Sequence, residues 1–281
     1  MSKTGPRASD PVIEAARTLA YDRYLAALLA PAAARDDLVV LAAYIGEVRR
    51  IPLIAQDAAI GEIRLQWWRD ALASGQSSGH PVADAVLEVK RRHALRDDLL
   101  MAPLEGVSRE LYEDGIRDLR ELADYAEETE GTPIRLALAV LGGERDRDAE
   151  RLVAPAGCAL ALTRLLLALP QHLAFGRLPL PAAILDPARD PRMLDPTEAR
   201  EAARGLIARL EDDAQRALAE FRKEQVHLAN GLFAAFLPVS LVAPYLKAVV
   251  APRRDVLAEV ADISPLSRVM RLWFAHLRGR V

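Results

Sequence analysis

The stretch that decides the fold is LAAYIGEVRRIPLIAQDAAIGEIRLQWWRDAL, residues 41–72. Its apolar residues recur three or four positions apart, which is the spacing of one face of an α-helix. Pro52 interrupts this pattern, so we expect the first helix to run from about residue 35 to 51 and to end there. After a short loop, a second helix is predicted over residues 58–73. The stretch therefore predicts two consecutive helices.

The same periodicity extends in both directions along the chain. Asp10 followed by Pro11 is typical of a helix start, and we expect that helix to continue until Pro31. Another long helix is predicted from about residue 146 to 169, before a Pro-rich irregular segment. No strand-like alternation is present. The pattern predicts an all-α fold with one domain over residues 1–281, of which residues 1–10 are expected to be flexible.

Composition limits the classes of function. The 281 residues are 51% hydrophobic, which is enough for a sizeable core, and the net charge of −3 argues against a nucleic-acid partner. The single Cys158 excludes an internal disulfide and any site built from several cysteines. The first residues lack the apolar core of a signal peptide, so a cytoplasmic location is expected.

Residues 228–246 form a run of 19 residues without a formal charge, close to the length that spans a bilayer. Pro238 and Pro244 interrupt the run. We therefore expect a buried core helix here and not a membrane span.

Spacing alone indicates no catalytic, metal or cofactor site. The five His residues show no short ligand spacing, and no nucleophile or phosphate-binding motif is present. Glu127, Glu128 and Glu130 are clustered acids, and Glu127 and Glu130 have a spacing at which they could face a metal together. A solvated helix face is the simpler interpretation.

Four stretches nevertheless follow one another in a recognisable order. They are AAYIGEVRRIPL (42–53), IRLQWWRDAL (63–72), YAEETEGTPIRLAL (125–138) and ALTRLLLALPQHLAFGRLPLP (161–181). Their order resembles that of the squalene/phytoene synthase family over about residues 21–185. The resemblance implies an isoprenoid-synthase-like helical bundle. Family members condense two prenyl diphosphates, using Mg²⁺ held by two acidic motifs.

The acidic positions of both motifs are changed in this chain. Where the family has motif acids, the aligned residues are Arg49, Arg50, Leu53, Ala168, Gln171 and His172, and the motif Asn is Arg164. Mg²⁺ requires hard oxygen ligands, and Arg offers no acceptor atom. The resemblance therefore predicts a bundle without a metal site and without a catalytic residue.

The loss of these acids resembles a non-catalytic branch of the family, related to the mitochondrial assembly factor for respiratory complex I. This implies a protein partner among complex I subunits or assembly intermediates, with at most peripheral contact with the inner membrane. The alternatives are a prenyl diphosphate transferase that uses other acids, such as Glu127, Glu128 or Glu130, and a polyprenyl- or lipid-binding protein.

The candidate remnant pocket consists of Glu47, Arg49, Arg50, Arg164 and Arg177. If Arg49, Arg50 and Arg164 converge, they could hold an anion without metal, because guanidinium groups bind phosphate through paired hydrogen bonds. The alternative is that acids such as Glu47 and Asp57 neutralise these arginines.

Overall fold

The computed structural model describes residues 8–112, 115–181, 196–251, 255 and 258–281, so most of the expected flexible segment 1–10 lies outside it. Within these ranges every regular element is a helix, which confirms the all-α prediction. The α-helices are α1 (Asp10–Leu19), α2 (Tyr21–Leu28), α3 (Ala32–Ile54), α4 (Ala58–Ser74), α5 (Pro81–His93), α6 (Asp97–Ser108), α7 (Leu119–Ala126), α8 (Thr132–Val140), α9 (Arg147–Ala174), α10 (Pro196–Glu224), α11 (Val242–Val249) and α12 (Pro265–Arg278). A π-helical segment, Glu127–Gly131, joins α7 to α8, and a 3-10 segment, Asn230–Leu241, precedes α11.

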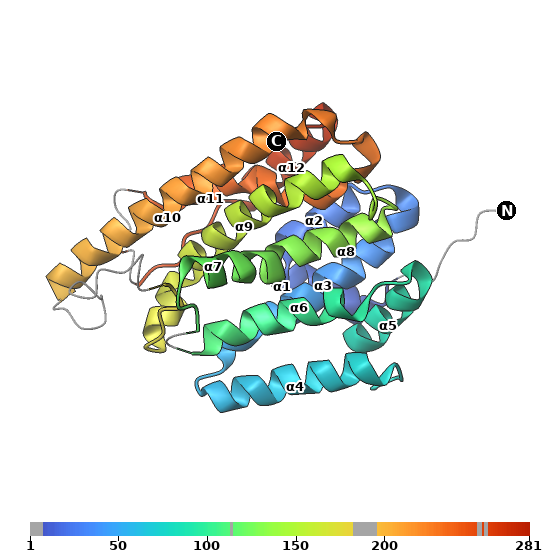
Figure 1. Ribbon diagram of the computed structural model, residues 1–281, viewed down its shortest axis with the longest axis horizontal. Helices are drawn as coiled ribbons and strands as arrows, with labels where there is room; N and C mark the ends of the chain where they lie inside the picture. The colour runs from blue at the N-terminus through green and yellow to red at the C-terminus, as the bar shows by residue number, and fades with distance from the viewer. Residues whose placement is uncertain (1–7, 113–114, 182–195, 252–254, 256–257) are drawn as a thin grey trace.

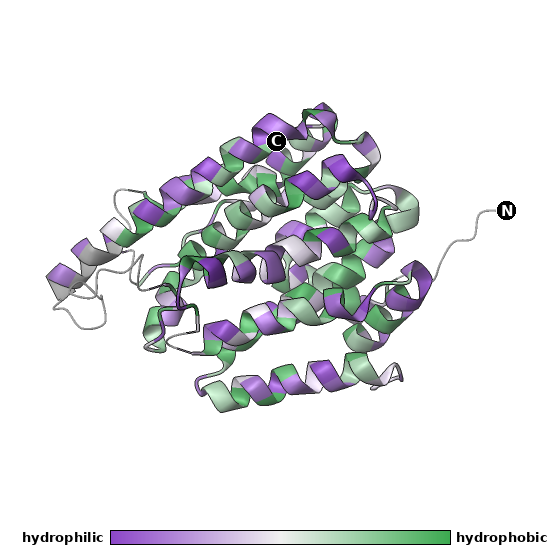
Figure 2. Ribbon diagram, viewed as in Figure 1, coloured by the Kyte–Doolittle hydropathy of each residue, from purple (hydrophilic) through white to green (hydrophobic). Residues whose placement is uncertain are grey.

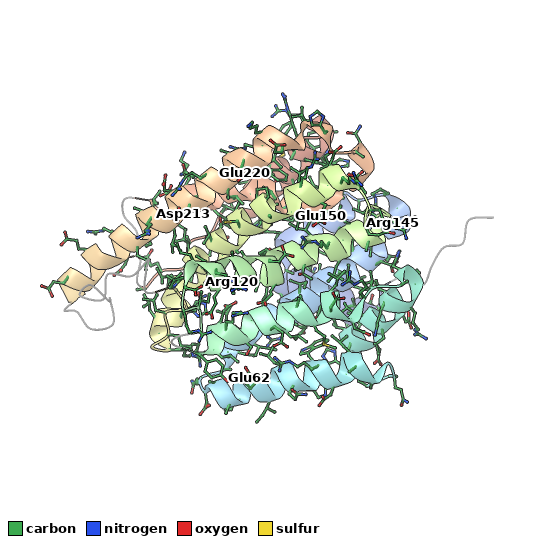
Figure 3. The ribbon with its side chains drawn as sticks, in the orientation of Figure 1. Glu62, Arg120, Arg145, Glu150, Asp213 and Glu220 are labelled. Atoms are coloured by element: carbon green, nitrogen blue, oxygen red, sulfur yellow. The ribbon has the colours of Figure 1, made fainter. Side chains whose placement is uncertain are left out.

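The helices form a bundle around α3, α8 and α9 (Figure 1). Helix α10 runs along α9 at one side of the bundle, and α4 forms the opposite edge beside α6. Apolar residues gather on the inner helices, whereas α4 and α10 alternate between hydrophilic and hydrophobic turns (Figure 2). The labelled side chains Arg120, Arg145, Glu150 and Glu220 are exposed on the outer surface (Figure 3).

The apolar interior consists of two clusters. One is built mainly from α1–α6, and the other mainly from α7–α11. Ala137, Leu141 and Leu167 pack against both clusters, so the interior is continuous from one half to the other.

Helix α3 does not end before Pro52, as the sequence predicted, but continues to Ile54. Proline removes one backbone donor, and this loss is tolerated in the last turn because other contacts hold the turn in place. The Ala55 N–H donates to the Ile51 carbonyl at 3.0 Å. The Arg177 side chain bonds to the carbonyl of Pro52 itself at 3.2 Å.

The single helix predicted between Asp10 and Pro31 is also wrong, because it is divided at Ala20 into α1 and α2. Helix α3 passes very close to this break. A Cβ atom added at Gly46 would lie 2.7 Å from the Leu19 Cβ and 3.2 Å from the Ala20 Cβ. Close packing of α3 against the break therefore overrides the continuous apolar pattern.

Residues 228–246 lie in the interior but form a 3-10 segment followed by α11, not one α-helix. Phe233, Phe236 and Leu237 of this segment are buried. Two helical stretches, Arg147–Ala174 and Asn230–Val249, are long and apolar enough to cross a membrane, but 72% of each apolar window is buried in the bundle. Core helices commonly meet the same criteria, so the finding is weak evidence for a span.

Candidate functional site: a buried ion-pair network

The centre of the site is the π-helical segment Glu127–Gly131, which carries one residue more per turn than an α-helix. Two glycines allow this wide turn to pack. A Cβ added at Gly131 would lie 2.5 Å from the Glu127 carboxylate, and one at Gly157 of α9 would lie 3.0 Å from the Gly131 amide nitrogen. The wide turn directs Glu130 into the bundle, where its side chain is 3% exposed.

Glu130 joins three other helices through arginines. Arg23 of α2 donates to its Oε2 at 2.6 Å, and Arg49 of α3 forms an ion pair with its Oε1. The Nε of Arg164, on α9, lies 3.5 Å from the same Oε1. Arg49 also donates to the Thr129 carbonyl at 2.8 Å. A single carboxylate therefore ties α2, α3 and α9 to the π-helical segment.

A second buried carboxylate, Glu110, completes the network. Arg164 donates to its Oε1 at 2.7 Å, and the Tyr125 hydroxyl donates to the same oxygen at 3.0 Å. The Nε2 of His172 lies 3.3 Å from Oε2. The Arg164 guanidinium also stands over the Tyr125 ring, 5.3 Å from its centroid. Arg164 therefore connects Glu110 with Glu130.

Burial and ion pairing shift the pKa values of these groups in opposite directions. Burial would raise the pKa of Glu110, but Arg164 and His172 outweigh it and hold the pKa at about 2. The pKa of Glu130 is likewise lowered, because Arg49, Arg23 and Arg164 outweigh its burial. Burial lowers the pKa of Arg49 to about 10, although Glu130 opposes the shift. Glu110, Glu130 and Arg49 are therefore charged at neutral pH.

The space beside the network is small. A cavity of about 120 Å³ is lined by Arg23, Arg49, Glu130 and Arg164, together with apolar residues of α9 and α11. A second cavity, among α2, α3, α8 and the segment Asn230–Leu241, measures about 30 Å³. Sites for small organic ligands commonly measure about 300–1,000 Å³. Both of these cavities are therefore smaller than a typical ligand site.

The five residues of the predicted remnant pocket do not share one pocket. Arg49 and Arg164 meet in the network, and their carboxylate partners are Glu130 and Glu110 in place of the expected Glu47 and Asp57. Arg50 is turned by about 100° around α3 from Arg49, and its Nη1 lies 3.7 Å from the Glu47 Oε2. That pair borders a separate surface groove of about 410 Å³ that also includes Trp67 and His80. Arg50 therefore does not converge with Arg49 and Arg164, because side chains adjacent on a helix point in different directions.

Arg177 has a different role. It is 5% exposed and donates to the carbonyls of Ala55 at 2.8 Å and Gln56 at 2.9 Å, in addition to its bond to Pro52. It follows Gly176, whose φ of 68° lies in the left-handed region and ends the α9 turn. Arg177 thus supports the end of α3 and does not reach the network.

Sequence reasoning missed Arg23, Glu110 and Tyr125 as members of the network. Glu110 lies in the 3-10 turn Arg109–Leu111, outside the four recognised motifs, and no local pattern marks it as buried. Glu130 was interpreted as part of a solvated helix face, and this interpretation is wrong because its side chain is 3% exposed. The signal that could have found these residues is charge balance, because two arginines at motif positions in the interior require carboxylates nearby.

The residues present do not fit Mg²⁺. Glu127 is paired with Arg135, and Glu128 with Arg109 at 3.1 Å, while Glu130 is enclosed by three guanidinium groups. No group of three or more His, Cys, Asp or Glu residues suited to a metal ion occurs in the described parts of the chain. The positive charge of three arginines also opposes a divalent cation.

The architecture defines a helical protein of the isoprenoid-synthase fold. It is similar to a dehydrosqualene synthase solved with a ligand, with a TM-score of 0.73, 17% identity and 96% of each chain covered. It is also similar to squalene synthase HpnC from Alicyclobacillus acidocaldarius, with a TM-score of 0.60, 20% identity, and 96% of this chain and 94% of that one covered.

The chain belongs to the squalene/phytoene synthase family, which it matches over residues 16–268. The family resemblance is confirmed and extends well beyond residues 21–185. Two relatives are named NADH dehydrogenase (ubiquinone) complex I, assembly factor 6. The protein from Bos taurus is 27% identical over 270 residues, covering 93% of this chain and 80% of its own. The one from Homo sapiens is 28% identical over 163 residues, covering 57% and 49%.

Proposed function

We propose that this chain is a non-catalytic member of its family that assists the assembly of a NADH–quinone oxidoreductase, respiratory complex I. The observation that carries the proposal is the ion-pair network. Arg49 and Arg164 stand at motif positions that the family resemblance assigns to Asp and Asn, and they bind Glu130 and Glu110. Metal-assisted departure of a diphosphate needs carboxylates that are free to bind Mg²⁺.

The names of the relatives support the choice of partner, because the bovine relative covers 93% of this chain. An assembly factor requires a stable surface and no catalytic group. The cavities of about 120 and 30 Å³ favour a protein partner over the alternative of a polyprenyl ligand held inside the bundle. We propose that the partner is a subunit or an assembly intermediate of the complex.

Deletion of the gene in its native host tests the proposal. We expect less assembled NADH–quinone oxidoreductase, measured by native gel and NADH oxidation, with unchanged squalene and carotenoid levels. The wild-type gene and the matched surface variant Glu127→Gln should both restore assembly. Normal oxidoreductase together with altered isoprenoids would contradict the proposal and favour a transferase.

A direct assay tests the catalytic alternative. The purified protein, incubated with farnesyl diphosphate, Mg²⁺ and NADPH, should release no diphosphate above a blank without protein. Release that is lost in Glu127→Gln or Glu128→Gln would show that substitute acids support catalysis. Affinity purification from the host, with mass spectrometry of proteins and lipids, should recover oxidoreductase subunits; recovery of a stoichiometric polyprenyl lipid without them would support the lipid-binding alternative.

A further inference from the structure

Helix α12, Pro265–Arg278, has two apolar faces, although the bundle uses only one. Leu272 and Ala275 face inward and are buried. A second set, three or four residues apart, remains 38% to 71% exposed: Leu266, Val269, Met270, Trp273, Phe274 and Leu277. At 3.6 residues per turn these six side chains form one stripe along the helix. We call this stripe the outer face of α12.

The outer face is not a consequence of a loosely placed helix. The Arg268 Nε lies 2.8 Å from the Asp22 Oδ1 and donates to the Tyr245 hydroxyl at 2.9 Å, which ties α12 to α2 and α11. After the helix, the Val281 amide donates to the Gln225 side chain at 2.7 Å. Ser264 caps the start of the helix, and Gly279 ends it with a φ of 59°. The bundle therefore presents the outer face in a fixed orientation.

The charged side chains of α12 and of the residues that follow it have one sign. Residues 265–281 include four Arg and no Asp or Glu. Arg268 is used internally, which leaves Arg271, Arg278 and Arg280 exposed. Helical geometry places Arg271 and Arg278 along one edge of the stripe. An apolar stripe with Trp and Phe, bordered by arginines, is typical of a helix lying in the interface of an anionic bilayer.

The exposed apolar patch on α4 provides a comparison within the same molecule. Ile60, Ile63 and Trp67 are 40% to 71% exposed there, so the patch is similar in kind. Helix α4 carries Glu62 and Asp70 together with Arg64 and Arg69, so its charges cancel and give no net attraction to anionic lipid. Compared with the α4 patch, the outer face of α12 combines apolar exposure with basic side chains and with no acidic residue in the same helix.

From this combination we propose that the outer face of α12 docks the protein on an anionic phospholipid surface. Trp273, Phe274 and Leu277 enter the interface, while Arg271, Arg278 and Arg280 contact lipid phosphates with their aliphatic parts against the acyl boundary. The proposal concerns the surface of α12 alone and does not rest on a role in complex I assembly.

Vesicle flotation of the full chain tests the proposal. Vesicles of phosphatidylcholine with about one third phosphatidylglycerol should bind the wild-type protein, and pure phosphatidylcholine should bind it much less. Changing Leu266, Trp273 and Leu277 together to Ser should lower the partition coefficient at least tenfold. Arg271→Ala and Arg278→Ala should each lower it about fivefold. Binding should also weaken at 1 M salt, where the Debye length is about 3 Å.

The matched control is Ile63→Ser with Trp67→Ser on α4, which should leave vesicle binding unchanged. All of these variants change exposed residues, so their melting temperatures should stay close to that of the wild type. Absence of binding to anionic vesicles, or an equal loss in the α4 control, overturns the proposal. A dimer in sedimentation that the α12 triple variant abolishes, without lipid, would instead assign the outer face to a second copy.

Discussion

Replacing Glu130 with Gln tests whether the ion-pair network holds the bundle together. The side chain keeps its size but loses the charge that faces Arg23 at 2.6 Å, Arg49, and Arg164 at 3.5 Å. Arg164 retains Glu110, whereas Arg23 and Arg49 lose their carboxylate partner. Removing one partner of a buried ion pair typically costs about 3–5 kcal/mol, because the other charge stays desolvated.

This cost converts to a measurable shift in melting temperature. A chain of 281 residues unfolds with an entropy of roughly 0.6 kcal/mol/K. We therefore expect Glu130→Gln to lower the melting temperature by roughly 5–8 °C, measured by calorimetry at pH 7. The control Glu127→Gln breaks the more exposed pair with Arg135 and should cost less than about 1 kcal/mol.

A double-mutant cycle shows whether the effect comes from the pair. Arg49→Met is the second change. The double variant should lose about 1–3 kcal/mol less free energy of unfolding than the sum of the losses in the two single variants. The reasoning would be refuted by a Glu130→Gln protein within 1 kcal/mol of the wild type, or by strictly additive effects.

Three further predictions follow from the same contacts. The pKa of Glu110 is held near 2, below its ordinary 4.5, so its contribution to the free energy of unfolding should be complete above pH 4.5 and should decline as the pH falls toward 2. Urea titrations should show that the free energy of unfolding falls by about 2 kcal/mol between pH 4.5 and 3. This loss should be absent in Glu110→Gln. Arg177→Ala should lower the free energy of unfolding in urea by about 2–4 kcal/mol. Arg177→Lys should recover less than half of that loss, because one ammonium group cannot reach the carbonyls of Pro52, Ala55 and Gln56 together. Millimolar Mg²⁺ should leave the melting temperature unchanged, since a ligand stabilises only the state that binds it, and a rise with Mg²⁺ would reveal a site that the arginines do not block.

The all-α class and the family were predictable from the sequence, because the first depends on local spacing of apolar residues and the second on the order of motifs. The spacing of apolar residues in 41–72 predicted α3 and α4, and the order of four motifs predicted the fold. The end of α3 was not predictable, because Arg177, more than 120 residues away, supports the turn at Pro52. Glu110 was missed for the same reason: its burial follows from contacts with Tyr125 and Arg164 that no local pattern encodes.

The network also explains why restoring a single motif acid should not restore a metal site. Arg49→Asp would place a second carboxylate beside Glu130, whose side chain is 3% exposed. Two ionised carboxylates in contact in a buried place destabilise each other. Glu130 would still pair with Arg23 and Arg164, so it would not be free to bind Mg²⁺. Ala168→Asp would add a buried charge on α9, one turn after Arg164, and Arg164 is already paired with Glu110. The change from acids to arginines is therefore coupled to Glu130 and Glu110, and the bundle depends on the whole set: its charges now join α2, α3 and α9 directly, where the family resemblance implies that Mg²⁺ and a diphosphate would lie.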